Sequence, residues 1–182
     1  MPLSKIVANS ITTNAVGADA LSSSAITNTD LPAGTVLQVV KSAIRTNAND
    51  TTSATYAEIS SDYRVTITPK AADSVMIIDF TFGISVDGGT KLAVITKVGT
   101  NSDFSTGMDS VHSQSHNELF RSDVDNNRRI QARSFLRSYY DDYSSTATLY
   151  FRQDYKRTSG SGTARVNDNT GPAFVTVTEI QQ

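Results

Sequence analysis

In the segment SVMIIDFTFGISV, residues 74–86, every second residue from Met76 to Val86 is apolar. A period of two places every second side chain on one face of a β-strand, whereas a helix needs a period near 3.6. The segment therefore predicts a half-buried strand. Asp87, Gly88 and Gly89 follow, and this turn chemistry predicts a hairpin into KLAVITKV at 91–98. The predicted apolar faces comprise Met76, Ile78, Phe80, Phe82, Ile84 and Val86, then Leu92, Val94 and Val98.

Other segments rich in Val, Ile, Thr and Tyr predict further short strands, with no convincing amphipathic helix between them. This pattern favours an all-β fold, an antiparallel β-sandwich of jelly-roll or related topology. Two polar stretches, 99–127 and 156–172, are too long for hairpin turns and predict surface loops. The weaker predicted strands are 35–45, 63–69, 128–140, 146–155 and 173–180, with 54–60 as a candidate for one more.

The first 31 residues follow a different rule, because an aliphatic residue returns every five positions. Residues five positions apart do not share a face in either a helix or a strand, so the spacing fits neither element. The segment is otherwise rich in Ser, Thr, Ala and Asn. Two interpretations stay open: a flexible arm with accidental spacing, or an arm covered by sister copies or by a partner's surface. The periodic residues are Ile6, Ile11, Val16, Leu21, Ile26 and Leu31.

Pro32 and Gly34 in LPAG end this pattern where the composition changes. We therefore predict an extended N-terminal arm at 1–34 and a β-sandwich domain at 35–182. The chain has no cysteine, which excludes disulfides, thiol nucleophiles and thiolate metal sites. A formal charge of -2 offers no general attraction to nucleic acid or anionic membranes. No apolar run resembles a signal peptide or a membrane span, so we expect no membrane insertion.

His112 and His116 lie four positions apart, and a helix would place this pair on one face, as a metal site requires. Glu118, Asp109 or histidines of neighbouring subunits could complete such a site. The flanking Ser and Asn residues do not favour a helix, so we interpret both histidines as solvent-exposed loop residues.

Asp123, Asp125 and Asn127 match the first, third and fifth positions of a calcium-binding loop. The rest of that pattern fails, because Arg128 stands where glycine is needed and Ser134 stands where a bidentate glutamate belongs. We therefore interpret this segment as a polar turn and expect no metal.

The sequence offers no recognisable catalytic constellation. No serine lies in a G-x-S-x-G motif, and the adjacent Asp141 and Asp142 would point to opposite faces of a strand, which favours a tight turn over a carboxylate pair. The SGSG segment at 159–162 lacks the lysine and following helix of a phosphate-binding loop, and is interpreted as a flexible loop. We expect no catalytic residue, no cofactor and no enzyme activity.

Aromatic and arginine residues are interleaved between 133 and 155, a composition suited to recognition surfaces. Two roles stay open: binding of a saccharide or protein, or capping of the core and filling of a subunit interface, which we favour. The cluster comprises Phe135, Tyr139, Tyr140, Tyr143, Tyr150 and Tyr155, with Arg133, Arg137 and Arg152. From it we select Tyr139, Tyr140, Tyr143 and Arg137 as candidate surface-recognition residues.

The arm, NSITTNAVGADAL and SSSAITNTDLPAG, and its continuation LPAGTVLQVVKS resemble the N-terminal repeats of bacteriophage tail-fibre and related virion proteins. The ending AFVTVTEIQQ looks like the final strand of such domains. The resemblance covers residues 1 to about 42 and the last ten. It implies a homotrimeric virion component whose arm serves attachment and trimerisation and whose β-sandwich faces outward, and it carries no catalytic or binding residues over.

We therefore expect a structural virion protein, a trimeric tail fibre or fibre-like appendage that contacts the host surface. One alternative is a capsid decoration or head-fibre protein. An alternative of another class is a carbohydrate-binding or depolymerising tailspike. The expected partners are two sister copies, other virion proteins that contact the arm, and host surface polysaccharide or protein.

Overall fold

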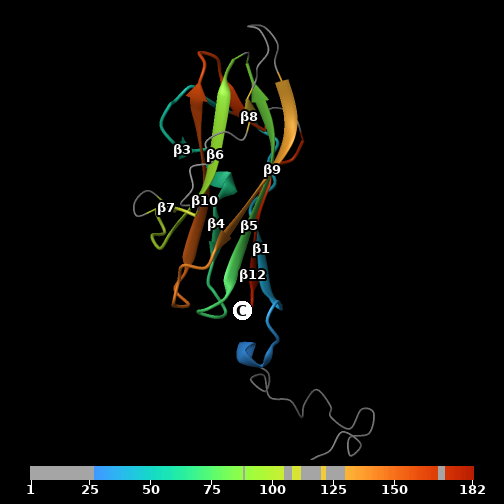
Figure 1. Ribbon diagram of the computed structural model, residues 1–182, viewed down its shortest axis with the longest axis vertical. Coiled ribbons are helices and arrows are strands. Elements are labelled where there is room, and N and C mark those ends of the chain that lie inside the picture. Colours follow the sequence, from blue (N-terminus) through green and yellow to red (C-terminus); the bar gives the residue numbers. More distant parts are fainter. Residues whose placement is uncertain (1–26, 88, 105–107, 112–119, 122–129, 168–170) are drawn as a thin grey trace, which may run out of the picture.

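The computed structural model describes residues 27–87, 89–104, 108–111, 120–121, 130–167 and 171–182. Within these ranges the chain forms antiparallel β-strands and two short 3-10 helices, Asn28–Asp30 and Ser61–Tyr63 (Figure 1). This confirms the predicted all-β class with antiparallel sheets. The strands form two sheets of six strands each.

The first sheet is centred on β5 (Val75–Val86). Along one edge β5 pairs with β9 (Ile130–Tyr140), and along the other it pairs first with β12 (Phe174–Ile180) and then with β11 (Ala164–Val166). The edge strands β1 (Val36–Lys41) and β2 (Asn49–Thr51) pair with β12 and β11 respectively. The sheet is therefore four strands wide along most of its length.

The second sheet is centred on β10 (Leu149–Ser159) and β6 (Lys91–Gly99), which pair along most of their lengths. The short strands of this sheet are β3 (Ala57–Glu58) and β4 (Val65–Ile67), which pair with β10, and β7 (Asp109–Ser110) and β8 (Phe120–Arg121), which pair with β6. Each strand predicted from the sequence thus corresponds to one of the observed strands.

The predicted hairpin between 74–86 and 91–98 is wrong. The turn exists, since the Thr90 amide donates to the Asp87 carbonyl at 3.0 Å, but β5 and β6 belong to different sheets. Both strands direct their apolar faces to the same core, so a short connection can cross from one sheet to the other. Alternation identifies the buried face of a strand and leaves its hydrogen-bonded neighbours open.

The prediction that 156–172 is a continuous polar loop is also wrong. β10 continues to Ser159, and Ala164 and Val166 of β11 are fully buried against β5. Three residues of alternating pattern are too short a signal to identify a strand from sequence. The tight turn predicted at Asp141 and Asp142 is instead the longer connection 141–148, because β9 and β10 lie in different sheets.

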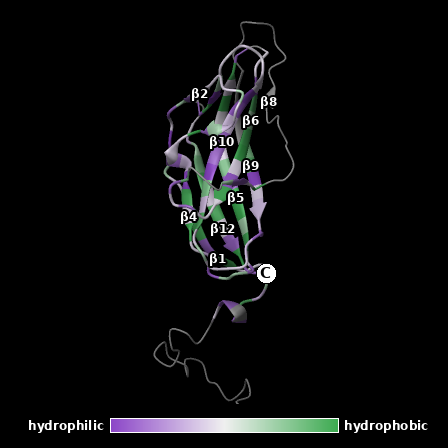
Figure 2. Cartoon of the chain, turned by 90° about the vertical axis from the view of Figure 1, so that its left-hand side faces the viewer, coloured by the Kyte–Doolittle hydropathy of each residue, from purple (hydrophilic) through white to green (hydrophobic). Residues whose placement is uncertain are grey.

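The two sheets share one hydrophobic core. All six residues of the predicted apolar face of β5 are fully buried, and Leu92, Val94 and Val98 of β6 are at most 3% exposed. Phe80 stacks on Phe82 with ring centroids 4.3 Å apart, and Tyr63 of the second 3-10 helix packs on Phe80 at 5.2 Å. Figure 2 shows the alternation of hydrophobic and hydrophilic residues along these strands. This alternation confirms the predicted core faces.

Residues 27–35 join the first sheet at the end of the molecule that also holds the C-terminus (Figure 1). The Asn28 side chain donates to the Lys70 carbonyl at 2.6 Å, and the Gly34 amide donates to the Gln181 carbonyl at 2.8 Å. The Gln181 amide donates in turn to the Thr35 carbonyl at 2.9 Å. Leu31 is half-buried here, whereas the other five periodic aliphatic residues lie outside the described residues.

Glu179, a buried carboxylate near the end of β12, is hydrogen-bonded to β1 and to the 70–74 segment. Its Oε1 accepts hydrogen bonds from the Lys70 and Ala71 amides at 2.7 and 3.0 Å and from the Ser74 hydroxyl at 2.6 Å. Its Oε2 accepts from the Gln38 amide at 2.6 Å. Four donors therefore compensate the loss of hydration that burial imposes on the carboxylate.

Candidate functional site

The side of the first sheet that faces away from the core carries rows of side chains that cross four strands. We call the side formed by β1, β12, β5 and β9 the outer face. Along one row Val39 pairs with Thr178, Thr178 with Ile77, and Ile77 with Tyr139. Val39 and Tyr139, at the two ends of this row, are 57% and 53% exposed. The row therefore presents apolar surface at both edges of the sheet.

The neighbouring row carries the charges of the outer face. It runs from Lys41 through Thr176 and Asp79 to Arg137. The Arg137 guanidinium donates two hydrogen bonds to Asp79, from Nε to Oδ1 at 2.6 Å and from Nη2 to Oδ2 at 2.8 Å. These bonds are the main reason that the pKa of Arg137 lies above its ordinary value. Arg137 therefore enters any contact with its charge already compensated.

The third row is aromatic. Phe174 pairs with Thr81, which pairs with Phe135 on β9. The Lys41 ammonium lies 3.9 Å from the centroid of the Phe174 ring, and the Arg137 guanidinium lies 5.4 Å from that of Phe135. Both cations thus lie over rings of the outer face, an arrangement typical of cation–π contacts.

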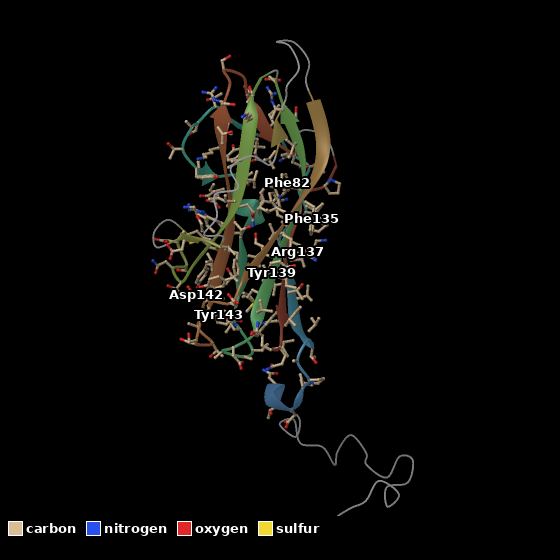
Figure 3. All side chains as sticks on the ribbon, in the orientation of Figure 1. Phe82, Phe135, Arg137, Tyr139, Asp142 and Tyr143 are labelled. Atoms are coloured by element: carbon tan, nitrogen blue, oxygen red, sulfur yellow. The ribbon has the colours of Figure 1, made fainter. Side chains whose placement is uncertain are left out.

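Exposed large apolar side chains concentrate on these strands. Five such side chains are exposed in the described part of the chain, and four of them, Val36, Val39, Phe135 and Tyr139, belong to β1 and β9. Figure 3 shows Phe135, Arg137 and Tyr139 following one another along β9. Because clustered exposed apolar side chains mark interaction sites more often than scattered ones do, the outer face is the candidate functional site.

The four predicted recognition residues do not form one surface. Arg137 and Tyr139 lie on the outer face, but Tyr140 packs on the core side, with its ring 5.7 Å from that of Tyr143 and 6.1 Å from that of Phe151. The Tyr143 hydroxyl lies 2.5 Å from the Ser74 hydroxyl. Burial raises the pKa of Tyr140 and that of Tyr143. Adjacent strand residues point to opposite faces, which separates Tyr139 from Tyr140.

Tyr150 and Tyr155 of the predicted aromatic cluster lie on β10 of the second sheet. Tyr155 is a core residue whose hydroxyl donates to the Asp50 carbonyl at 2.7 Å. Tyr150 makes an edge-to-face contact with Phe104 at 5.2 Å. The cluster seen in the sequence therefore divides among the outer face, the core and the far side of the second sheet.

Sequence reasoning missed a buried ion pair on this far side. Asp154 is fully buried although it points away from the core, and Arg152 Nη2 donates to its Oδ2 at 3.0 Å. Arg152 Nε lies 2.8 Å from Oδ1 without hydrogen-bond alignment, and Lys97 Nζ lies 4.0 Å from Oδ2. Arg152 also donates to the Phe104 carbonyl, so this pair joins the 100–104 segment to β10. Strand alternation predicts that Asp154 is exposed, and nothing in the sequence indicates which residues bury it.

The predicted metal ligands are only partly within the described residues. Asp109 begins β7 and Ser134 lies within β9. The remaining candidates lie outside the described residues: His112, His116, Glu118, Asp123, Asp125, Asn127 and Arg128. Among the residues that the structure does describe, no group of three or more His, Cys, Asp or Glu could hold a metal ion.

The SGSG segment forms the connection from β10 to β11 and packs closely on a neighbouring turn. Gly160 has a φ of +82°, and a Cβ there would lie 2.5 Å from the Gly89 carbonyl oxygen. The predicted loop is thus a close backbone contact that requires glycine.

No family model matches the chain, and no curated protein is significantly similar to it. Within the described ranges, no helix has both the length and the apolar character needed to cross a bilayer.

Proposed function

We propose that the protein is a structural component of a bacteriophage virion, a homotrimeric tail fibre or fibre-like appendage without enzyme activity. In this proposal the two sheets are an antiparallel β-sandwich of jelly-roll-like type. Residues 1–34 attach it to other virion proteins, and the domain at 35–182 faces outward and contacts the host surface. The sequence resemblance of the arm motivates this assignment.

The observation that supports the proposal most directly is the polarity of the domain. Residues 27–35 and the C-terminus meet at one end, where Asn28 and Gly34 are hydrogen-bonded to Lys70 and Gln181. The C-terminal ends of β5 and β10 lie at the other end (Figure 1). An arm that starts at one end of an elongated β domain can anchor it and leave the opposite end available for contact.

The experiment that tests attachment compares three forms of the chain in cells that assemble particles. The first lacks residues 1–31, the second carries Ser at Ile6, Ile11, Val16, Leu21 and Ile26, and the third carries Ala at five arm serines and threonines as the matched control. We expect the first two to stay soluble and folded but absent from purified particles, and the control to be incorporated. Normal incorporation of the first form would refute attachment through the arm.

Two further measurements separate the proposal from its alternatives. Gold labelling of the protein on particles should mark the tail, and label over the head lattice would indicate a decoration protein instead. Incubation with host polysaccharide should release no oligosaccharide, whereas release would indicate a depolymerising tailspike.

A further inference from the structure

We propose that the outer face, together with the unpaired edge of β9, is the surface through which copies of this chain pack against one another. This inference rests on the proposed homotrimer and names its interface. The occupant is a second copy of the same chain, and three independent features of the surface support it.

The first feature is the edge of β9. Its pairing with β5 continues without a register shift from Ile130 to Tyr140, and its sequence, IQARSFLRSYY, contains neither proline nor glycine. In the part of the chain that the structure describes, no strand pairs with the opposite edge of β9. By contrast, the short edge strand β1 carries a bulge between Val36 and Gln38 and ends on Lys41. A long edge without bulge or proline is a surface that proteins normally cover.

The second feature is the charge of the outer face. Asp79 already compensates Arg137 through two hydrogen bonds, and Lys41 lies over the Phe174 ring. The described part of this surface therefore carries one net positive charge, on Lys41, and exposes Val39, Phe135 and Tyr139. A strongly acidic or nucleic-acid partner would need several uncompensated cations here. In a homotrimer the β9 side of one copy meets the β1 side of the next, so Phe135 and Tyr139 would pack against Val39 with little charge to oppose the contact.

The third feature is the area of the surface. The sheet is four strands wide, and β5 and β9 pair over eleven successive residues. The four strands of the outer face comprise 36 residues, so with spacings of about 4.8 Å between strands and about 3.3 Å per residue the face measures about 570 Å². A stable interface buries about 800 Å² per partner, so the outer face and the β9 edge together have the required size.

The test substitutes the two ends of the exposed apolar row. Val39→Lys with Tyr139→Lys places cations in the proposed interface, and Thr66→Lys, at an exposed strand position of the second sheet, is the matched control. The mass of each protein is measured by analytical ultracentrifugation over a range of concentrations. Circular dichroism checks that each one is folded. A milder pair, Val39→Thr with Tyr139→Thr, keeps strand-forming residues. It tests the same interface if the lysine variant does not fold.

We expect a trimer for the natural sequence and for Thr66→Lys, and a folded monomer for the lysine pair. The threonine pair should raise the concentration of half-dissociation at least tenfold. If both pairs remain as trimeric as the natural protein, this interface is refuted while the proposed function stands. A natural protein that is monomeric refutes both. Trimeric variants that lose binding to host polysaccharide would also refute the interface and assign the outer face to saccharide binding.

Discussion

Asp79 and Arg137 lie directly opposite each other on β5 and β9, and two hydrogen bonds of 2.6 and 2.8 Å join them. The pair stands among exposed apolar side chains, with Phe135 and Tyr139 two positions away on either side of Arg137. The same two strands also contribute the buried residues Phe80 and Ser138 to the interior. One face of this strand pair thus serves the core while the other is available for contact.

Arg137→Lys should have little effect on folding. Lysine keeps the charge but cannot form the two-pronged contact with Asp79, and the pair is partly exposed, with 47% of the Arg137 side chain accessible. We expect the urea midpoint of unfolding to stay close to that of the natural protein, as measured by fluorescence or circular dichroism. A midpoint shift as large as that of Glu179→Gln would contradict a surface role for the pair.

Glu179→Gln should be clearly destabilising. The amide that replaces Oε2 would face the Gln38 side-chain amide, and two donors would then meet at a buried position. We expect a loss of about 1–3 kcal/mol in the free energy of unfolding, measured by urea titration. Glu58→Gln is the matched control, because Glu58 forms a partly exposed ion pair with Arg64 and should cost less. Equal losses in the two variants would contradict the role assigned to Glu179.

Gly160→Ala should destabilise the chain more than Gly34→Ala does. Both glycines have positive φ, +82° and +88°, so alanine strains the backbone at each by about 1–2 kcal/mol. Only at Gly160 would the new Cβ also collide with backbone, 2.5 Å from the Gly89 carbonyl oxygen, whereas nothing lies within 4 Å of it at Gly34. We expect an additional loss of about 1–3 kcal/mol for Gly160→Ala in urea unfolding. Similar losses at both positions would show that this turn contact is absent.

Asp154 should make folding dependent on pH. Burial raises its pKa above the ordinary value of 3.8, and the opposing effects of Arg152 and Lys97 are smaller. The native carboxyl therefore binds its proton more tightly than the unfolded one. This stabilising contribution is complete below pH 3.8 and is lost as the pH rises through the native pKa. Carbon-13 NMR of the Asp154 carboxyl should give a titration midpoint above 3.8.

Asp154→Asn is the accompanying variant for the pH prediction. The stability difference between the natural protein and this variant, measured by urea unfolding at several pH values, should shift against the natural protein as the pH rises from 3.8. A carboxyl midpoint at or below 3.8, or a stability difference that does not change with pH, would contradict the assignment of burial as the dominant effect.

The sequence alone determined the longer strands and the core-facing side of each, while the short strands β2, β7, β8 and β11 gave no such signal. Phe80 and Leu92 are core residues because alternation is a local property of a strand, and burying one face of it is favourable whichever strands lie beside it. The same reasoning places Arg137 and Tyr139 together, since residues two apart share a face.

Only the tertiary structure decided how the strands are paired and which polar groups are enclosed. β5 pairs with β9, β11 and β12 instead of β6, because pairing depends on segments far apart in the chain that alternation does not identify. Alternation places Glu179 on the core face of β12 without indicating the donors that a buried carboxylate needs, and it predicts an exposed Asp154. Donors from other segments surround Glu179, and Asp154 is buried beside Arg152 and Lys97. A charged side chain can be buried only where hydrogen-bond donors or opposite charges compensate it. Apart from Arg152, these groups come from distant segments of the chain, so only the fold brings them together.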